Sequence, residues 1–170
     1  MYFEDEMRTG TRSQSKRRWT PKGHRPVCRV KPGYEFCYLY TAMAPATGDL
    51  ISLIPPDMSK ESFGVFVDYF GERTRALYGN KQVVLIADKA GSHQMNICEQ
   101  RGIALQRLPT ACPELNPVER FFEELRNLLS DHIFENIEEV EVYLCKILKR
   151  YYNHPDQIVQ LCYYPYMHTT

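Results

Sequence analysis

Residues 83–93 read VVLIADKAGSH, an apolar run that ends on the carboxylate of Asp88 and then turns through small residues. This is the most apolar segment of its length that turn residues bound, and it predicts a buried strand over 82–87. Two roles are open for Asp88: it caps the turn, or the strand holds its carboxylate at a fixed point. The stretch alone does not separate them, because aspartate is common in turns.

Outward from this strand, apolar alternation and helical spacing divide the rest of the chain. ATGD at 46–49 is typical of a hairpin turn, so the strands on either side of it are expected to be antiparallel. Antiparallel strands followed by alternating strands and helices indicate an α/β fold, a mixed five-stranded sheet with helices on both faces. Besides 82–87, we expect strands at 1–6, 34–44, 50–54 and 103–108, and helices at 59–78, 92–101, from 116, and 137–151.

Length and composition favour one domain over 1–170, since 170 residues with 44% apolar content suffice for one full core. No apolar run approaches the roughly 18 residues that a membrane span needs, and the N-terminus is acidic where a secretory signal would be basic. The six scattered cysteines read as reduced thiols. A cytoplasmic protein with no membrane partner is therefore expected.

Charge is unevenly distributed along a chain whose net charge is zero. The segment from Arg8 to Lys31 holds nine basic residues and no acid, which leaves 12 basic residues against 21 acids elsewhere. This asymmetry predicts a basic insertion at 8–33 that binds a polyanion, while a merely solvated basic loop is an equally good interpretation of the composition.

Two further acids stand near predicted element ends. Asp5 is expected to end the first strand, and if that strand neighbours 82–87 its carboxylate faces Asp88, a pairing that favours a bound divalent cation. Glu119 follows Asn116 and Pro117 at the start of a helix. That spacing also forms a capping box, in which Glu119 only bonds the backbone of Asn116, and the residues alone favour this interpretation.

Several of these motifs together resemble a known family. The segments YFEDE (2–6), RRWTPKGHRPV (17–27), ADKAGSH (87–93) and PELNPVERFFEELR (113–126) are similar, in this order, to the catalytic domain of DDE transposases. The likeness is to the bacterial insertion-sequence (six-thirty) branch of the mariner superfamily, and it extends to the tail CYYPYM at 162–167. It implies an RNase H-like fold with C-terminal helices over 116–161.

The resemblance also implies an active site and a reaction. The family's first aspartate matches Asp5, its second Asp88 and its glutamate Glu119, which together would hold two Mg²⁺ or Mn²⁺ ions. The implied reaction is metal-dependent cleavage of transposon-end phosphodiesters and strand transfer to target DNA. Phosphate contacts of the DNA partner are expected from the basic insertion and from a histidine behind the second aspartate: Arg17, Arg18, Lys22, Arg25 and His93.

Full-length relatives carry helix-turn-helix domains ahead of this region, whereas only four residues precede Asp5. We therefore expect no N-terminal helix-turn-helix domain here, and a DNA-reading half that is separately encoded or joined by frameshifting. A homodimer and association with the nucleoid are further expectations. Two other functions stay open: a catalytically inactive DNA-binding relic of a transposase, and a stand-alone RNase H-like nuclease.

Three neighbouring residues carry alternatives of their own. Lys89 departs from the family pattern, and its ammonium either points away from the site or folds toward Asp88, where it would compete with metal. Glu123, one turn after Glu119, is the substitute for the third acid. Trp19 is expected to pack rather than to contact a base.

Overall fold

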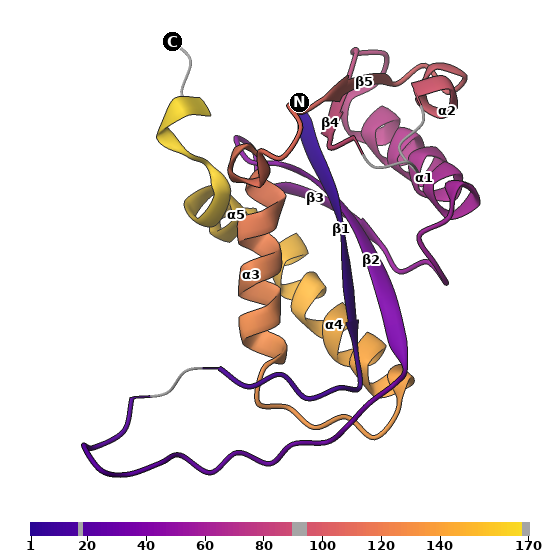
Figure 1. Ribbon diagram of the computed structural model, residues 1–170. Coiled ribbons are helices and arrows are strands. Elements are labelled where there is room, and N and C mark those ends of the chain that lie inside the picture. Colours follow the sequence, from indigo (N-terminus) through magenta and orange to yellow (C-terminus); the bar gives the residue numbers. More distant parts are fainter. Residues whose placement is uncertain (17–18, 90–94, 168–170) are drawn as a thin grey trace.

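The computed structural model describes residues 1–16, 19–89 and 95–167. In this part of the chain five strands form one sheet in the order β3-β2-β1-β4-β5 (Figure 1). The first three strands are antiparallel, whereas β4 and β5 run parallel to β1. The predicted mixed five-stranded sheet is confirmed. Its strands are β1 (Tyr2–Gly10), β2 (Phe36–Ala44), β3 (Asp49–Leu53), β4 (Val84–Ala87) and β5 (Ala104–Arg107).

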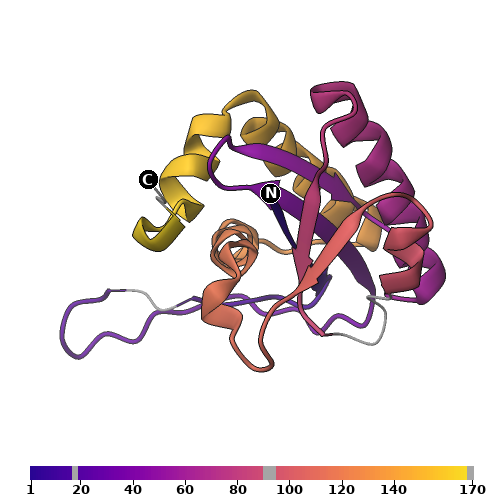
Figure 2. The same cartoon turned by 90° about the horizontal axis from the view of Figure 1, so that it is seen from above.

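Helices cover both faces of this sheet, as Figure 2 shows from above. One face carries α1 and α2, and the opposite face carries α3, α4 and α5. The described helices are α1 (Lys60–Tyr78), α2 (Met95–Glu99), α3 (Pro117–Leu129), α4 (Ile137–Asn153) and α5 (Pro155–Cys162), with 3-10 turns at Pro113–Leu115 (η1) and Pro165–Met167 (η2). None of them is long and apolar enough to cross a bilayer.

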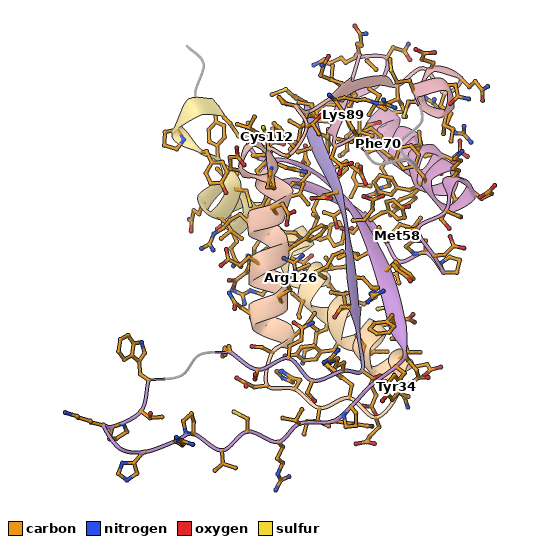
Figure 3. All side chains as sticks on the ribbon, viewed as in Figure 1. Tyr34, Met58, Phe70, Lys89, Cys112 and Arg126 are labelled. Carbon is orange, nitrogen blue, oxygen red and sulfur yellow. The ribbon has the colours of Figure 1, made fainter. Side chains whose placement is uncertain are left out.

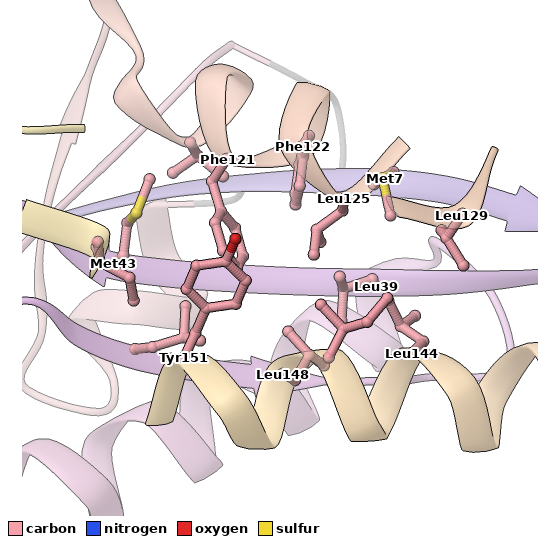
Figure 4. Packing of buried hydrophobic residues seen from close by; sticks show 14 of the residues in the cluster. Met7, Leu39, Met43, Phe121, Phe122, Leu125, Leu129, Leu144, Leu148 and Tyr151 are labelled. Carbon is pink, nitrogen blue, oxygen red and sulfur yellow. The ribbon is translucent and has the colours of Figure 1, made fainter. Parts of the chain in front are cut away.

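Strand alternation divides the core into two clusters. Phe3 and Met7 of β1 face α3 and α4, while Tyr2 faces α1, because successive side chains of a strand point to opposite faces. The α3–α4 side is filled by large apolar side chains from both helices (Figure 4). Asp5 has the same parity as Phe3 and Met7, so it lies on the α3 side of the sheet.

The first strand is longer than the sequence predicts. The acids at 4–6 were expected to end it, but β1 continues to Gly10 because β2 pairs with it from Phe3 to Gly10. The expectation that Asp5 ends a strand is wrong. β4 pairs with β1 only at Tyr2 and Phe3, so Asp5 lies in the middle of β1, beyond the point where β4 diverges.

The helix predictions are largely confirmed, with two changes. Residues 92–94 of the helix expected at 92–101 lie outside the described residues, and its described part ends at Glu99. The last helix, expected to end at Tyr151, runs to Asn153 and is followed by α5, whose first residue is Pro155. Proline suits a first helical position, where its missing N–H costs nothing. All six cysteines are free thiols, as expected.

The described residues 11–16 and 19–35, which follow β1 and precede β2, extend from the body (Figure 1) and are called the basic arm below. Two backbone hydrogen bonds join the two ends of the arm. The N–H of Thr11 donates to the carbonyl of Glu35 at 3.1 Å, and the N–H of Ser13 donates to the carbonyl of Lys31 at 3.2 Å. The Nζ of Lys31 donates to Oε2 of Glu135 at 2.8 Å, in the loop between α3 and α4. The basic arm is therefore attached at the C-terminal end of α3.

Candidate active site

A cavity of about 320 Å³ lies where β4 and β5 end and α3 begins. Ligands commonly bind beyond the carboxyl ends of parallel strands, because the loops diverge there. The three acids singled out in the sequence all line this cavity. Its lining residues are Asp5, Asp88, Lys89, Leu108, Pro109, Thr110, Ala111, Cys112, Pro113, Asn116 and Glu119.

Pairing of β1 with β4 brings the two aspartates to one cavity. Tyr2 pairs with Leu85 and Phe3 with Ile86 in the parallel β1–β4 ladder, which ends there. Beyond it, Asp5 and Asp88 line the same cavity, and the charge of Asp88 acts on the pKa of Asp5. The hypothesis that neighbouring strands bring these carboxylates to one place is therefore confirmed, although Asp5 reaches it from mid-strand.

The carboxylate of Asp5 is held on both oxygens. The backbone N–H of Glu6 donates to Oδ1 at 2.9 Å, and the side-chain amide of Asn116 donates to Oδ2 at 3.3 Å. The same amide also donates to the carbonyl of Glu4 at 3.0 Å. Asn116 is 3% exposed. This one residue therefore fastens the start of α3 to β1 at Asp5.

The pKa of Asp5 is raised to about 7, chiefly because burial disfavours its charged form. The hydrogen bond from Glu6 acts in the opposite direction and lowers the pKa. The negative charges of Glu119, Glu6 and Asp88 raise it further. The charges of both other candidate acids therefore act on the pKa of Asp5, as expected for carboxylates that share one cavity.

Glu119 lies in the first turn of α3, where the helix dipole favours a negative charge. The capping-box interpretation is wrong. The backbone N–H of Asn116 donates to the carbonyl of Pro113 at 2.9 Å, and the side chain of Asn116 caps the helix by accepting from the N–H of Val118 at 3.2 Å. The carboxylate of Glu119 lies 3.9 Å from the guanidinium of Arg126, and Glu119 lines the cavity.

Glu123, the substitute for the third acid, accepts a hydrogen bond from Arg120 at 2.5 Å and lies outside the cavity lining. Lys89 does line the cavity, at the same end of the molecule as Cys112 (Figure 3). Its Nζ donates to Oγ1 of Thr110 at 3.0 Å. Of the two orientations open for Lys89, the contact found is with the loop after β5 and not with Asp88.

The donors fit a hard divalent cation in type, because three carboxylates from three elements line one cavity and repel one another. A cation between them would relieve the repulsion that raises the pKa of Asp5. Among the described residues, however, no three histidine, cysteine or acidic side chains are close enough together to hold a metal ion as they stand. The fit is therefore one of donor chemistry and of location in one cavity.

The expected DNA contacts lie elsewhere. Lys22 and Arg25 are exposed in the basic arm, whereas Arg17, Arg18 and His93 lie outside the described residues. The arm is attached beyond the C-terminal end of α3, while the cavity is at its N-terminal end, about 20 Å away for a helix of 13 residues. The prediction that Trp19 packs is wrong, because its side chain is fully exposed.

Residues 1–141 match the sequence profile of a family described as "DDE superfamily endonuclease". The chain belongs to the DDE endonuclease superfamily. A curated relative is "Uncharacterized protein y4pE/y4sA" of Sinorhizobium fredii (strain NBRC 101917 / NGR234), which is 28% identical over 128 residues, 74% of this chain and 93% of the relative. The predicted resemblance to the DDE family is thereby confirmed.

Solved structures of a transposase share the fold. The Mos1 transposase paired-end complex with left transposon end aligns with a TM-score of 0.68 and 14% identity over 94% of this chain. The catalytic domain of Mos1 mariner transposase aligns with a TM-score of 0.60 and 12% identity over 95%. The RNase H-like fold is therefore confirmed. The chain spans 52% of the first Mos1 chain and 78% of the second, so it corresponds to part of that transposase.

Sequence reasoning missed two features of this DDE domain. Asn116 was recognised as a helix cap, but its hydrogen bond to Asp5 joins residues 111 positions apart and has no local signal. Thr110, the partner of Lys89, was not singled out because a threonine in a Pro-containing loop is unremarkable in composition.

Proposed function

We propose that this chain is the catalytic domain of a DNA transposase of the insertion-sequence branch, which cleaves transposon-end phosphodiesters and transfers the freed strand to target DNA. The observation that carries the proposal is the convergence of Asp5, Asp88 and Glu119 from three elements on one cavity. Membership of the DDE endonuclease superfamily supports it, since such a site needs three acids in this chain order.

Asp5 and Asp88 would hold a shared Mg²⁺ or Mn²⁺ ion and Glu119 would complete a second site. Two such ions would activate the attacking water or 3'-hydroxyl and stabilise the leaving oxygen. Contacts within the chain hold these acids in place. Pairing of β1 with β4 brings the two aspartates to one cavity, and Asn116 ties Asp5 to the start of α3. The cavity would hold about ten waters at roughly 30 Å³ each, enough for a phosphate and hydrated ions.

DNA is the proposed partner, and the neighbour described as a paired-end complex with a transposon end supports it. The exposed arm residues Lys22 and Arg25 would contact the phosphate backbone without reading sequence, from an arm that is attached at the end of α3 opposite to the cavity. A helix-turn-helix half, a homodimer and association with the nucleoid belong to the same proposal.

Cleavage of DNA that carries the ends of the element tests this function. The wild-type chain and Asp88→Asn are compared with and without Mg²⁺ or Mn²⁺. Metal-dependent nicking by the wild type, with strand transfer and without activity in Asp88→Asn, is the expected result. Nicking without strand transfer would indicate a stand-alone RNase H-like nuclease instead.

A second candidate function is DNA binding without catalysis. The observation that favours it is the ammonium of Lys89, which lines the same cavity as the three carboxylates. DNA binding by the wild type, with no cleavage under either metal, would support this function and contradict catalysis.

A further inference from the structure

Lys89 is the one basic residue among the described residues that line the catalytic cavity. It follows Asp88 at the end of β4 and is exposed. A cation at this position is unexpected in a site whose three acids would serve to bind metal ions. Its ammonium would be drawn to those acids unless another group held it.

Thr110 is that group, since its hydroxyl accepts a hydrogen bond from Lys89 at 3.0 Å. The two residues lie on adjacent chain segments. The N–H of Leu108 donates to the carbonyl of Ala87 at 2.8 Å, which continues the β4–β5 pairing one step beyond the strands. Ala111, next to Thr110, has a φ of 59° and turns the loop back along the cavity wall. The backbone therefore sets both partners on the same wall.

A structural role is a weak explanation for this pair. Both side chains are exposed, and an exposed hydrogen bond of a mobile lysine adds little to stability. No ion pair of Lys89 is found within the described chain, so its positive charge is not neutralised by the contact with Thr110. An un-neutralised ammonium beside a hydroxyl is instead suited to an anion with several acceptor oxygens.

We propose that Lys89 and Thr110 form a phosphate subsite, which binds a non-bridging oxygen of a DNA phosphate next to the one that is cleaved. The inference rests on the proposed function, since it takes DNA as the ligand of the cavity. DNA that enters a cavity with three carboxylates meets repulsion, and a cation in the lining next to Asp88 offsets it locally. Lys89 thus positions the strand without occupying the acids that the metal ions require.

Acetylation of lysines in the folded chain, read by mass spectrometry with and without a short DNA duplex, tests the subsite directly. The metal is left out so that no cleavage occurs, and anisotropy of the labelled duplex reports binding. DNA is expected to slow acetylation of Lys89 several-fold. Lys81, an exposed lysine before the start of β4, is the internal control and is expected to react at an unchanged rate.

Variants give the second readout. Lys89→Met is expected to weaken DNA binding about tenfold and to make the dependence of log affinity on log salt shallower by about 1. Lys89→Arg is expected to restore most of the affinity, and Thr110→Val to lose less than Lys89→Met. Lys81→Met is the matched control that keeps wild-type affinity.

Failure of the subsite and failure of the proposed function are distinguishable. If DNA binds but leaves Lys89 fully reactive, or if Lys89→Met binds like the wild type, the subsite is overturned while the function stands. Protection of Lys89 by inorganic phosphate but not by DNA would overturn DNA as the ligand. If the wild type does not bind DNA at all, both are overturned.

Discussion

The side-chain amide of Asn116 donates a hydrogen bond to Oδ2 of Asp5 at 3.3 Å, across 111 positions of sequence. The same side chain caps α3, whose first turn carries Glu119. One residue thus performs two tasks, because its amide nitrogen points at β1 while its oxygen points at the helix. A change that removes the nitrogen and keeps an oxygen separates them.

Asn116→Ser keeps an oxygen that can cap α3 and removes the amide that donates to Asp5, since the serine hydroxyl is one bond shorter and its oxygen is engaged at the cap. We expect little change in helix content but a 10- to 100-fold loss of Mn²⁺ affinity, about the effect of losing an outer hydrogen-bond partner of a metal ligand. Isothermal titration with Mn²⁺ and thermal denaturation measure the two effects.

The matched control is Asn136, which caps α4 by accepting from the N–H of Glu139 at 2.9 Å. Asn136→Ala is expected to cost about 1 kcal/mol of stability and to leave Mn²⁺ affinity unchanged. Equal metal affinities for Asn116→Ser and the wild type would show that the contact with Asp5 does not position the acid.

The pKa of Asp5, raised to about 7 by burial and then by its acidic neighbours, makes stability depend on pH. Because the folded pKa is raised, the contribution of this group to stability is complete below its unfolded value near 4 and is lost as pH rises toward 7 and beyond. The metal-free wild type is therefore expected to lose about 3 kcal/mol relative to Asp5→Asn between pH 5 and pH 8.

Urea denaturation of both proteins over this pH range, without divalent metal, measures the difference. Mg²⁺ is expected to raise the Tm of the wild type more at pH 8 than at pH 5, because the carboxylates are then charged. A stability difference that stays constant from pH 5 to pH 8 would refute the raised pKa.

The apolar core between α3 and α4 stabilises the helix that carries Glu119. Leu125 of α3 is fully buried there among apolar side chains of both helices (Figure 4). Leu125→Ala is expected to lower the free energy of unfolding by about 3 kcal/mol, because it removes buried carbon and leaves a cavity. Val142 on α4 is 70% exposed, so Val142→Ala is the control and should stay within about 0.5 kcal/mol of the wild type.

The basic arm should contribute to DNA affinity through charge alone. Changing Lys22 and Arg25 together to Gln is expected to lower affinity uniformly across DNA sequences and to make the salt dependence shallower by about 2. Stability should not change, because both residues are exposed. The control of equal charge changes two exposed lysines of α4, Lys146 and Lys149, to Gln. If that pair lost the same DNA affinity, the effect would come from net charge and not from contacts of the arm.

Much of the fold could be predicted from the sequence. The apolar run before Asp88, the hairpin at 46–49 and the helical spacing of 60–78 are local patterns, and each produced the expected element. That the first strand neighbours 82–87 was only a condition of the metal-site hypothesis, and the pairing of β1 with β4 fulfils it. The rest of the strand order came from the structure. The three acids could also be named, because each stands in a short motif. Their assignment to metal binding stays a prediction.

Local patterns determined which segments of this protein are strands and helices, since hydrophobic period depends only on neighbouring residues. Tertiary structure decided how far β1 extends, because β2 supplies hydrogen bonds to residues that look like a strand end. It also decided that Glu119 is not a capping residue, since the N–H of Asn116 has another partner. Asn116, Lys89 and Thr110 gained their roles only from contacts between distant segments, which the sequence does not display as a pattern.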